Sequence, residues 1–504
     1  KQKKKKKKTM KKILLCAFII ATNLAISQSK TSLTVKESTV YKDEVSSNEI
    51  FSIHTTKNGL TGVIRKAKRN ITFDIFDKDL NKVFSKIVKH HKKETFVGEL
   101  FYEKEIKFFT VFSPKKKERI LYCHIFNLDT KTYKKVQLFA TTVAKRQNLF
   151  SARNKRQTSF ALSPDGNYFA INTDNIKKNI NSYTIRVFDA NSLKLAYAKT
   201  YQTHESTYFE PNDLLIDNDK NVYAVGKSFL KGKSQKKKKK ANYTFILNKI
   251  NKDKAAVLTI DLKEEHIQSV VFSRTNTGLH LLGFYSEKNI SRIKGGFDFI
   301  IDLKNFTIAS KKKHQLPQEV YQDLYGYRKA KKKSKNELSN FTVDYVIKDN
   351  ENNTFLIAEE FYITQSYVSN GTMGGYWTTT YHYDDLLILK FDVNGQLNWG
   401  RSIFKRSTSP SYNVFLKDNK LQILLNSGKK LTHKKDGRTK VSKGWLESTA
   451  LYNIVLSKDG DIVYEKIQDN KKNTKYIPFY GTYENDRFIM PSAGRKKKRF
   501  MILK

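Results

Sequence analysis

The sequence predicts an all-β protein, a β-propeller with seven or eight blades, each blade a four-stranded antiparallel sheet. Past residue 45 the chain is a series of short apolar and aromatic runs with period-two alternation, and helical periodicity is nearly absent. One hairpin recurs along the chain, with a turn rich in Asp, Asn and Gly between its two strands. The length of 504 residues exceeds one ordinary core and suits either several domains or one large repeat fold.

The composition narrows the class further. Hydrophobic residues make up 39% of the chain, which is enough to bury a core and argues against wholesale disorder. The counts of 7 Pro and 22 Gly exclude collagen-like and Pro-rich classes. Two cysteines cannot make a disulfide framework or a Cys-rich zinc module.

The recurring hairpin defines the blades. A second pair of strands precedes it, most clearly in residues 160–172, 213–226 and 413–427. Two hairpins give a four-stranded sheet, and a series of these at a spacing of roughly 50 to 90 residues is typical of propeller blades. The hairpins that we identify are residues 71–88, 120–139, 183–201, 243–262, 297–311, 385–403 and 451–467.

These hairpins give seven full units, and a remnant of three strands follows in residues 476–504. Such a remnant commonly completes its blade with a strand from the other end of the chain, because this removes an open sheet edge. Residues 32–37 are the candidate for that strand, within an N-terminal segment of residues 28–47. We expect the propeller itself to span residues 48–504, and two packed β domains are the alternative.

The stretch SPDGNYFAI, within residues 160–172, joins two strands through a Ser-Pro-Asp-Gly turn. It resembles the TolB-like and other WD-type propeller repeats. The match covers one blade, and the Trp-Asp end of a WD repeat is absent. The resemblance implies the fold and carries no site residue with it.

The start of the chain has the layout of a secretory signal. Residues 10–27 combine a basic start, an apolar run and small residues before a cleavage point after Ser27. Residues 1–9 are interpreted as an over-extended start. Cleavage would remove nine lysines, lower the formal net charge from +47 to +38, and leave one thiol, Cys123, which we expect to be buried and structural. We expect an exported protein, periplasmic or extracellular, with no membrane span.

The positive charge is predicted to lie on one face. In a propeller the turns between the second and third strands of each blade share a face with the crossovers between blades, and both kinds of loop are rich in lysine here. Such a face attracts polyanions, although solvated lysine runs that bind nothing are the alternative. The residues expected to form this anion-binding face are Arg65, Lys66, Lys68, Arg69, Lys115, Lys116, Lys117, Lys236, Lys237, Lys238, Lys239, Lys240, Lys434, Lys435, Arg495, Lys496, Lys497 and Lys498.

The expected partner is an acidic glycan, lipopolysaccharide, nucleic acid or an acidic protein. Lysine dominates over arginine, and it lacks the planar fork that reads base edges, so sequence-specific nucleic acid is not expected. An uncharged loop on the same face, residues 366–383, holds the aromatic residues Tyr367, Tyr376, Trp377 and Tyr381. These rings can stack on sugars or bases. Alternatively, the loop folds over the central channel and buries its own aromatics.

Candidates for catalysis are few. His382 with Asp384 and Asp385 comes nearest to a metal or acid–base cluster, but the spacing fits no known ligand set well. Glu359 and Glu360 lie on a strand, so their side chains face opposite ways and do not form a carboxylate pair by themselves. The sequence predicts no metal and no cofactor and assigns no catalytic residue. A propeller-type glycan hydrolase or lyase with its site at the channel mouth is the alternative to a binding or scaffold protein, because acids from different blades can meet there.

Overall fold

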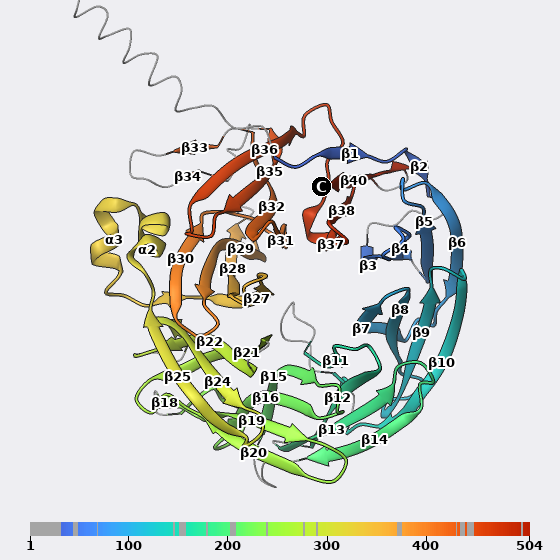
Figure 1. Ribbon diagram of the computed structural model, residues 1–504, viewed down its shortest axis with the longest axis horizontal. Helices are drawn as coiled ribbons and strands as arrows, with labels where there is room; N and C mark the ends of the chain where they lie inside the picture. Colours follow the sequence, from blue (N-terminus) through green and yellow to red (C-terminus); the bar gives the residue numbers. More distant parts are fainter. Residues whose placement is uncertain are drawn as a thin grey trace, which may run out of the picture.

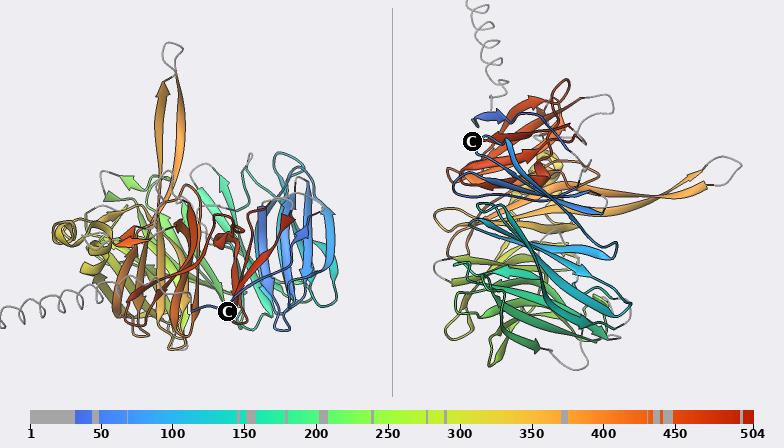
Figure 2. Two further views of the ribbon diagram at one scale, coloured as in Figure 1. Left: turned by 90° about the horizontal axis from the view of Figure 1, so that it is seen from above. Right: turned by 90° about the vertical axis from the view of Figure 1, so that its right-hand side faces the viewer.

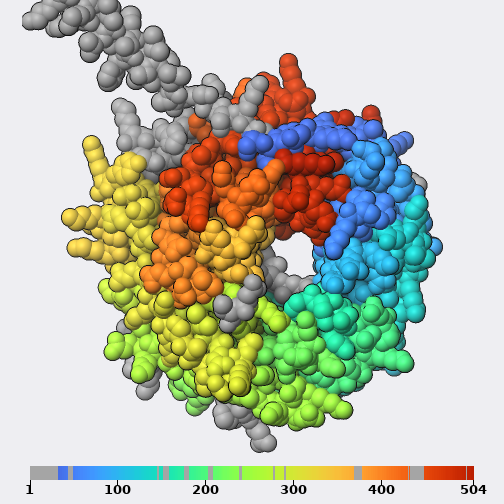
Figure 3. Space-filling model, in the orientation of Figure 1, coloured from blue at the N-terminus to red at the C-terminus, as the bar shows by residue number. Residues whose placement is uncertain are grey.

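The strands of this chain form a closed ring of sheets around a central hole, as the computed structural model shows (Figures 1 and 3). The structure describes residues 32–43, 49–67, 69–144, 147–150, 158–177, 180–201, 208–237, 240–275, 278–288, 291–369, 375–429, 431–433, 439–440, 448–494 and 497–504. In this part of the chain, eight sheets have four antiparallel strands each. The predicted fold class is confirmed, and the described sheets make eight blades.

The blades follow one another along the chain. The first blade consists of β3 (Glu49–Thr55), β4 (Thr61–Ala67), β5 (Asn70–Phe76) and β6 (Lys82–Lys89). The second consists of β7 (Glu94–Tyr102), β8 (Glu105–Phe112), β9 (Glu118–Asn127) and β10 (Thr132–Thr142). The third consists of β11 (Phe160–Leu162), β12 (Tyr168–Lys177), β13 (Ile180–Asp189) and β14 (Leu195–Tyr201). The fourth and fifth are β15 (Phe209–Ile216), β16 (Val222–Phe229), β19 (Tyr243–Ile250) and β20 (Ala255–Ile260), then β21 (His266–Thr275), β22 (Gly278–Ser286), β24 (Gly295–Asp302) and β25 (Thr307–Gln315).

The remaining blades complete the ring. The sixth and seventh are β27 (Phe341–Lys348), β28 (Thr354–Ser369), β29 (Gly375–Phe391) and β30 (Leu397–Ile403), then β31 (Tyr412–Lys417), β32 (Lys420–Gly428), β35 (Thr449–Leu456) and β36 (Ile462–Asp469). The eighth is β37 (Thr482–Glu484), β38 (Arg487–Pro491), β40 (Phe500–Leu503) and β1 (Val35–Glu37). Two-stranded sheets pair β2 (Tyr41–Lys42) with β39 (Lys497–Lys498), β17 (Lys236–Lys237) with β18 (Lys240–Ala241), β23 (Arg292–Ile293) with β26 (Leu338–Ser339), and β33 (Thr432–His433) with β34 (Thr439–Lys440).

The eighth blade is assembled from both ends of the chain. Its outermost strand, β1, runs antiparallel to β40, with Val35 opposite Leu503 and Glu37 opposite Met501. β1 lies within residues 32–37. Because β40 then has a partner on both sides, the ring closes without exposing a long unpaired edge between its first and last blades.

The hydrophobic core is a series of interfaces between blades. Eight buried clusters each join one blade to the next. The cluster that closes the ring packs Ile53 and Val63 of the first blade against Ile489 and Ile502 of the eighth. No blade could bury its two faces alone, so each depends on its neighbours, as in other repeat architectures.

The two faces of the disc differ in their turns. We call the side from which the long β28–β29 hairpin projects the hairpin face; it also carries the turns between second and third strands and the crossovers between blades (Figure 2). Several turns on the opposite face contain an aspartate whose carboxylate accepts hydrogen bonds from two backbone N–H groups of the same turn. These aspartates are Asp77, Asp189, Asp217, Asp302, Asp349 and Asp392.

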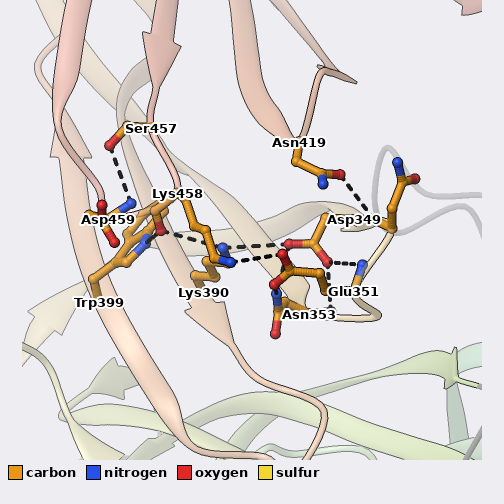
Figure 4. Close-up of polar contacts among 10 residues, drawn as sticks. Asp349, Glu351, Asn353, Lys390, Trp399, Asn419, Ser457, Lys458 and Asp459 are labelled. Carbon is orange, nitrogen blue, oxygen red and sulfur yellow. Dashed lines mark hydrogen bonds and ion pairs between the residues drawn. The ribbon is translucent and has the colours of Figure 1, made fainter.

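The blade that carries the long hairpin is fixed to its neighbour at this opposite face (Figure 4). The Nζ atom of the buried Lys390 lies 3.5 Å from Asp349, and Lys458 of the seventh blade lies 2.7 Å from Glu351. The indole N–H of Trp399 donates to the Lys458 carbonyl at 2.8 Å. These contacts hold the sixth blade in place beneath its hairpin.

In the described part of the chain, three short helices interrupt the β pattern, and the sequence did not predict them. α2 (Gln318–Tyr325) and α3 (Tyr327–Lys333) lie in the crossover from the fifth to the sixth blade, and η3 (Pro478–Tyr480) precedes β37. α2 buries Val320, Tyr321 and Leu324 in the core between those two blades. Arg401 of β30 pairs with Asp323 at 2.8 Å and ties α2 to the sixth blade.

Candidate functional site

The β28–β29 hairpin leaves the disc as a two-stranded ribbon. β27 pairs with β28 only as far as Glu360, and β30 pairs with β29 from Leu386 onward. Beyond that point the two strands continue to pair with each other, up to Ser369 opposite Gly375. The ribbon therefore stands out from the hairpin face instead of covering the channel (Figure 2).

The ribbon has one aromatic side and one polar side. Cross-strand partners share a side, which places Tyr367 with Trp377, and Ile363 with Tyr381. Tyr367, Trp377 and Tyr381 are 54%, 68% and 49% exposed. The interpretation in which the loop buries these three rings is therefore wrong, because the ribbon has no blade beside it. Tyr376 belongs to β29, but its side chain lies outside the described part of the structure.

Cross-strand contacts hold the ribbon together. The rings of Tyr367 and Trp377 meet edge to face with centroids 5.4 Å apart. On the polar side, His382 stacks on Tyr362 at 4.4 Å and its Nε2 atom lies 2.8 Å from the Thr364 hydroxyl. An isolated two-stranded ribbon is marginally stable in water. The contacts between aromatic side chains therefore stabilise this ribbon, which has no third strand beside it.

A cavity of about 710 Å³ opens at the root of the ribbon, at the seam between the fifth and sixth blades. Its walls come from the fifth blade, from the crossover that holds α2 and α3, and from the base of β28 and β29. The lining residues are Lys288, Arg292, Leu324, Tyr325, Lys333, Lys335, Asn336, Glu337, Leu338, Ser339, Phe341, Glu360, Asp385, Phe404 and Arg406.

Two carboxyl groups meet in this cavity, and sequence reasoning did not bring them together. Asp385 is only 6% exposed, and its Oδ1 accepts the backbone N–H of Lys405 at 3.1 Å. Burial and the nearby Glu360 carboxylate raise the pKa of Asp385 to about 7. Burial and the charge of Asp384 likewise raise the pKa of Glu360. One of the two groups can therefore hold a proton near neutral pH.

The acidic residues next to Glu360 and Asp385 in the sequence have partners within the protein. Asp384 accepts the Tyr362 hydroxyl at 2.9 Å and lies 3.2 Å from Arg406. Glu359 points the other way and pairs with Lys405 at 2.7 Å, so the expectation that Glu359 and Glu360 face opposite sides holds. His382 is bound on the polar side of the ribbon and is not among the cavity-lining residues. Among the described residues, no group of three or more His, Cys, Asp or Glu side chains is arranged to hold a metal ion.

The predicted anion-binding residues fall into three groups. The exposed ones are Arg69, Lys115, Lys116, Lys117, Lys236, Lys237 and Lys497, and Lys66 is half-buried. Lys66 lies near the end of β4, and the exposed residues all lie in segments between the second and third strands of a blade, where β17 holds Lys236 and Lys237 and β39 holds Lys497. Lys68, Lys238, Lys239, Lys434, Lys435, Arg495 and Lys496 lie outside the described residues, as does the side chain of Lys240.

Two of the predicted residues are not part of an open face. Arg65 is 2% exposed and pairs with Asp74 and with Asp43, the latter at 2.6 Å. Lys498 is 3% exposed and lies 3.6 Å from the same Asp43. Their charges are used inside the protein, where they tie the N-terminal segment to the first and eighth blades. Assigning them to an anion-binding surface was wrong.

A second charged cluster lies on the innermost strands of three blades. His54 of β3 contacts Glu484 of β37 at 2.7 Å and Glu99 of β7 at 3.5 Å. Burial lowers the His54 pKa, but the two glutamates outweigh it and raise the pKa to about 9. At neutral pH the imidazolium is thus paired with two carboxylates. The predicted structural role of Cys123 fits its complete burial, which raises the thiol pKa to about 12.

No family model matches the sequence, and a search of curated proteins finds no match. Solved structures share its fold at very low identity. The Dos1 propeller aligns with a TM-score of 0.47 at 8% identity, covering 92% of this chain and 94% of that one. An oligogalacturonate lyase from Vibrio parahaemolyticus aligns with a TM-score of 0.38 at 10% identity, over 91% and 98% of the two chains. No residue role is carried over from either.

Proposed function

We propose that this chain is an exported, non-enzymatic β-propeller that binds an anionic partner on its hairpin face. The resemblance of residues 163–171 to TolB-like and WD-type repeats belongs to the same proposal and concerns the type of propeller only. In the part of the chain that the structure describes, no helix is long and apolar enough to cross a membrane.

The observation that carries this proposal is where exposed lysines lie. Lys115–Lys117 are exposed in the turn between β8 and β9, and Lys331–Lys333 are exposed at the end of α3. The β8–β9 turn is one of the loops that we assign to the hairpin face, whereas α2 and α3 lie at the outer rim of the disc beside β30 (Figure 1). Lysines grouped on one side attract polyanions and speed their capture, and the effect weakens steeply with salt.

Turn chemistry accounts for the acidic residues of the opposite face but not for these lysines. Each repeated aspartate there accepts backbone N–H groups of its own turn, so its position follows from the fold. A lysine has no comparable role in a turn, and the three lysines from Lys115 point into solvent. This contrast favours a binding role for the lysines over one in shaping the turns.

The alternative, a glycan hydrolase or lyase acting at the channel mouth, is supported by the meeting of His54, Glu99 and Glu484 on the innermost strands. Its chemistry fits less well. A histidine with a pKa of about 9 is protonated at neutral pH and already neutralised by two glutamates, so it is not poised to accept a proton from a substrate. We therefore rank binding first.

Salt elution tests the proposal. The mature protein should be retained on heparin and phosphate resins and should elute with moderate salt. The triple variant Lys115→Ser, Lys116→Ser, Lys117→Ser should elute at distinctly lower salt, with little change in stability because the residues are exposed. The control triple variant Lys104→Ser, Lys252→Ser, Lys254→Ser removes the same charge from the opposite face and should elute like the wild type. Equal shifts in both triple variants would contradict a binding face.

A further inference from the structure

We propose that the cavity at the root of the β28–β29 hairpin binds a sugar unit of an acidic polysaccharide. The inference rests on the proposed anion-binding function and names the class of partner. The walls of this cavity hold several cations together with three carboxyl groups. Glu337 accepts backbone N–H groups of Glu287 and Lys288, so Glu360 and Asp385 are the carboxyl groups considered for a ligand.

The carboxyl groups select for a ligand that brings hydrogen-bond donors. Asp385 is nine-tenths buried, and its Oδ1 atom accepts a hydrogen bond from the Lys405 N–H. Because Asp385 lines the cavity, its carboxyl group can accept a hydrogen bond from a hydroxyl group of a ligand. A phosphodiester or polyphosphate chain has no such donor and would be repelled by Glu360. A sugar ring presents several hydroxyl groups.

The cations select for a ligand that is also negatively charged. Arg292, Lys333 and Lys335 are exposed residues of the fifth blade and of the crossover, and Arg406, which follows β30 of the sixth blade, also lines the cavity. Arg406 already pairs with Asp384, and Lys333 lies 5.3 Å from the centre of the Tyr325 ring. Neutral sugars would leave these charges unused, whereas the carboxylate or sulfate groups of an acidic sugar would pair with them.

The ribbon above the cavity carries exposed aromatic rings, which also suit a sugar ligand. Tyr381 lies four residues from Asp385 along β29, and Trp377 lies eight, which places their backbones roughly 13 and 26 Å away at about 3.3 Å per residue. Exposed Trp and Tyr rings combine a large apolar surface with a polar group and suit the faces of sugar rings. An extended polymer whose one unit fills the cavity could therefore place further units along the ribbon.

The volume of the cavity is large enough for a sugar unit. A cavity of about 710 Å³ lies within the range of sites that bind small molecules, and it exceeds the needs of a single ion. The cavity is mixed in character, since Leu324, Phe341 and Phe404 line it together with the charged groups. Such a mixture of apolar wall and a few convergent polar groups is typical of ligand sites.

Calorimetric titration tests the inference with four probes: an alginate hexasaccharide, a heparin hexasaccharide, polyphosphate of matched charge and maltohexaose. The alginate probe should bind the mature protein more tightly than polyphosphate, and maltohexaose should bind at least tenfold more weakly. Glu360→Gln should weaken alginate binding at least tenfold, whereas polyphosphate binding should not weaken, because the repulsion by the Glu360 carboxylate is removed. Lys335→Ser, an exposed position that does not endanger folding, should weaken alginate binding by about threefold, and the control Lys252→Ser should change nothing.

The outcomes separate the two proposals. If no polyanion binds at all, the proposed function itself fails. If polyphosphate binds as tightly as the hexasaccharides, or if Glu360→Gln leaves both hexasaccharides unaffected, the anion-binding face stands and the sugar site is overturned. Dependence on Glu360 for the heparin probe alone would support a sulfated polysaccharide as the partner.

Discussion

The cluster around Arg65 and the cluster at the root of the β28–β29 hairpin both place buried charges near the hairpin face, but they are built differently. Arg65 and Lys498 enclose Asp43, with Asp74 as a second partner of Arg65, and all four side chains are almost completely buried. Glu360 and Asp385 instead face a cavity of about 710 Å³. The first cluster has its counter-charges within the protein, and the second leaves room for a ligand whose hydroxyl groups donate hydrogen bonds to the carboxyl groups.

This difference shows how a structural charge is told from a site. Removing one partner of a sealed pair leaves an uncompensated charge and destabilises the protein. Replacing a carboxyl group that lines an open cavity, and whose ionisation is unfavourable, by a neutral group should instead stabilise the protein. Stability should therefore respond in opposite directions to substitutions in the two clusters, although both are buried and both contain carboxylates.

The largest effect is expected from Arg65→Met. The substitution leaves Asp43 and Asp74 buried without their shared cation, although Lys498 stays near Asp43. We expect the free energy of unfolding to fall by about 3–5 kcal/mol. Urea denaturation followed by circular dichroism measures this change. A loss below about 1 kcal/mol would show that the cluster does not tie the ends of the ring together.

His54 should give a pH-dependent effect of intermediate size. Its folded pKa of about 9 lies above the ordinary histidine value of 6.5, so the stability it adds is fully present below pH 6.5 and is lost as the pH rises toward 9. The free energy of unfolding should fall by on the order of 3 kcal/mol over this range. The variant His54→Gln should lack that part of the pH dependence. An unchanged profile would contradict the pairing of His54 with Glu99 and Glu484.

Asp385→Asn should stabilise the protein, in contrast to Arg65→Met. Burial and the Glu360 carboxylate raise the folded pKa of Asp385 to about 7, above the ordinary value of 3.8. Wild-type stability therefore declines as the pH rises from about 4 to 7, because the carboxyl ionises in the unfolded chain but stays protonated in the folded protein, where its ionisation is unfavourable. The neutral amide avoids that ionisation. At pH 8 we expect a gain of on the order of 2 kcal/mol, with a smaller gain at pH 5.

Thermal denaturation of Asp385→Asn and wild type at the two pH values measures the gain. Hexasaccharide binding by the same variant should weaken, because the amide changes the hydrogen bonds offered to the ligand. A variant that is less stable than wild type at pH 8 would place Asp385 with Arg65 among the structural charges.

The smallest effect on stability is expected from Trp377→Ala. The side chain is 68% exposed and contacts Tyr367 across the ribbon, so the free energy of unfolding should change by less than about 0.5 kcal/mol. Binding of the alginate hexasaccharide should weaken by about fivefold if the ribbon extends the site. The control Tyr327→Ala removes another exposed ring, 62% exposed in α3, and should bind like the wild type. Equal losses in both variants would remove the ribbon from the site.

The sequence predicted the fold because alternation and turn residues are local signals. The hairpins at residues 71–88 and 451–467 coincide with β5–β6 and β35–β36. α2 was missed because its apolar residues Val320, Tyr321 and Leu324 occupy barely two turns, too few for a helical period to stand out from lysine-rich surroundings.

The site was only partly accessible from sequence. Folding residues 366–383 back about the Gly-rich turn, as a hairpin, would have set Glu360 opposite Asp384 and Asp385, so the signal was present. Arg65 was misplaced because β4 is buried on both sides, where alternation does not tell inward from outward residues. The cavity itself depends on the packing of α2 and α3 against the sixth blade, which no local pattern encodes.

Competition for a labelled alginate hexasaccharide tests the central claim most directly. Unlabelled hexasaccharide and polyphosphate are added to the wild-type protein at equal charge and at about 150 mM salt, and the displaced label is followed by fluorescence anisotropy. A cavity that reads both hydroxyl groups and negative charge predicts displacement by the hexasaccharide at a concentration at least tenfold lower than by polyphosphate. Equal displacement by the two competitors would show that charge alone is recognised and would contradict the sugar site.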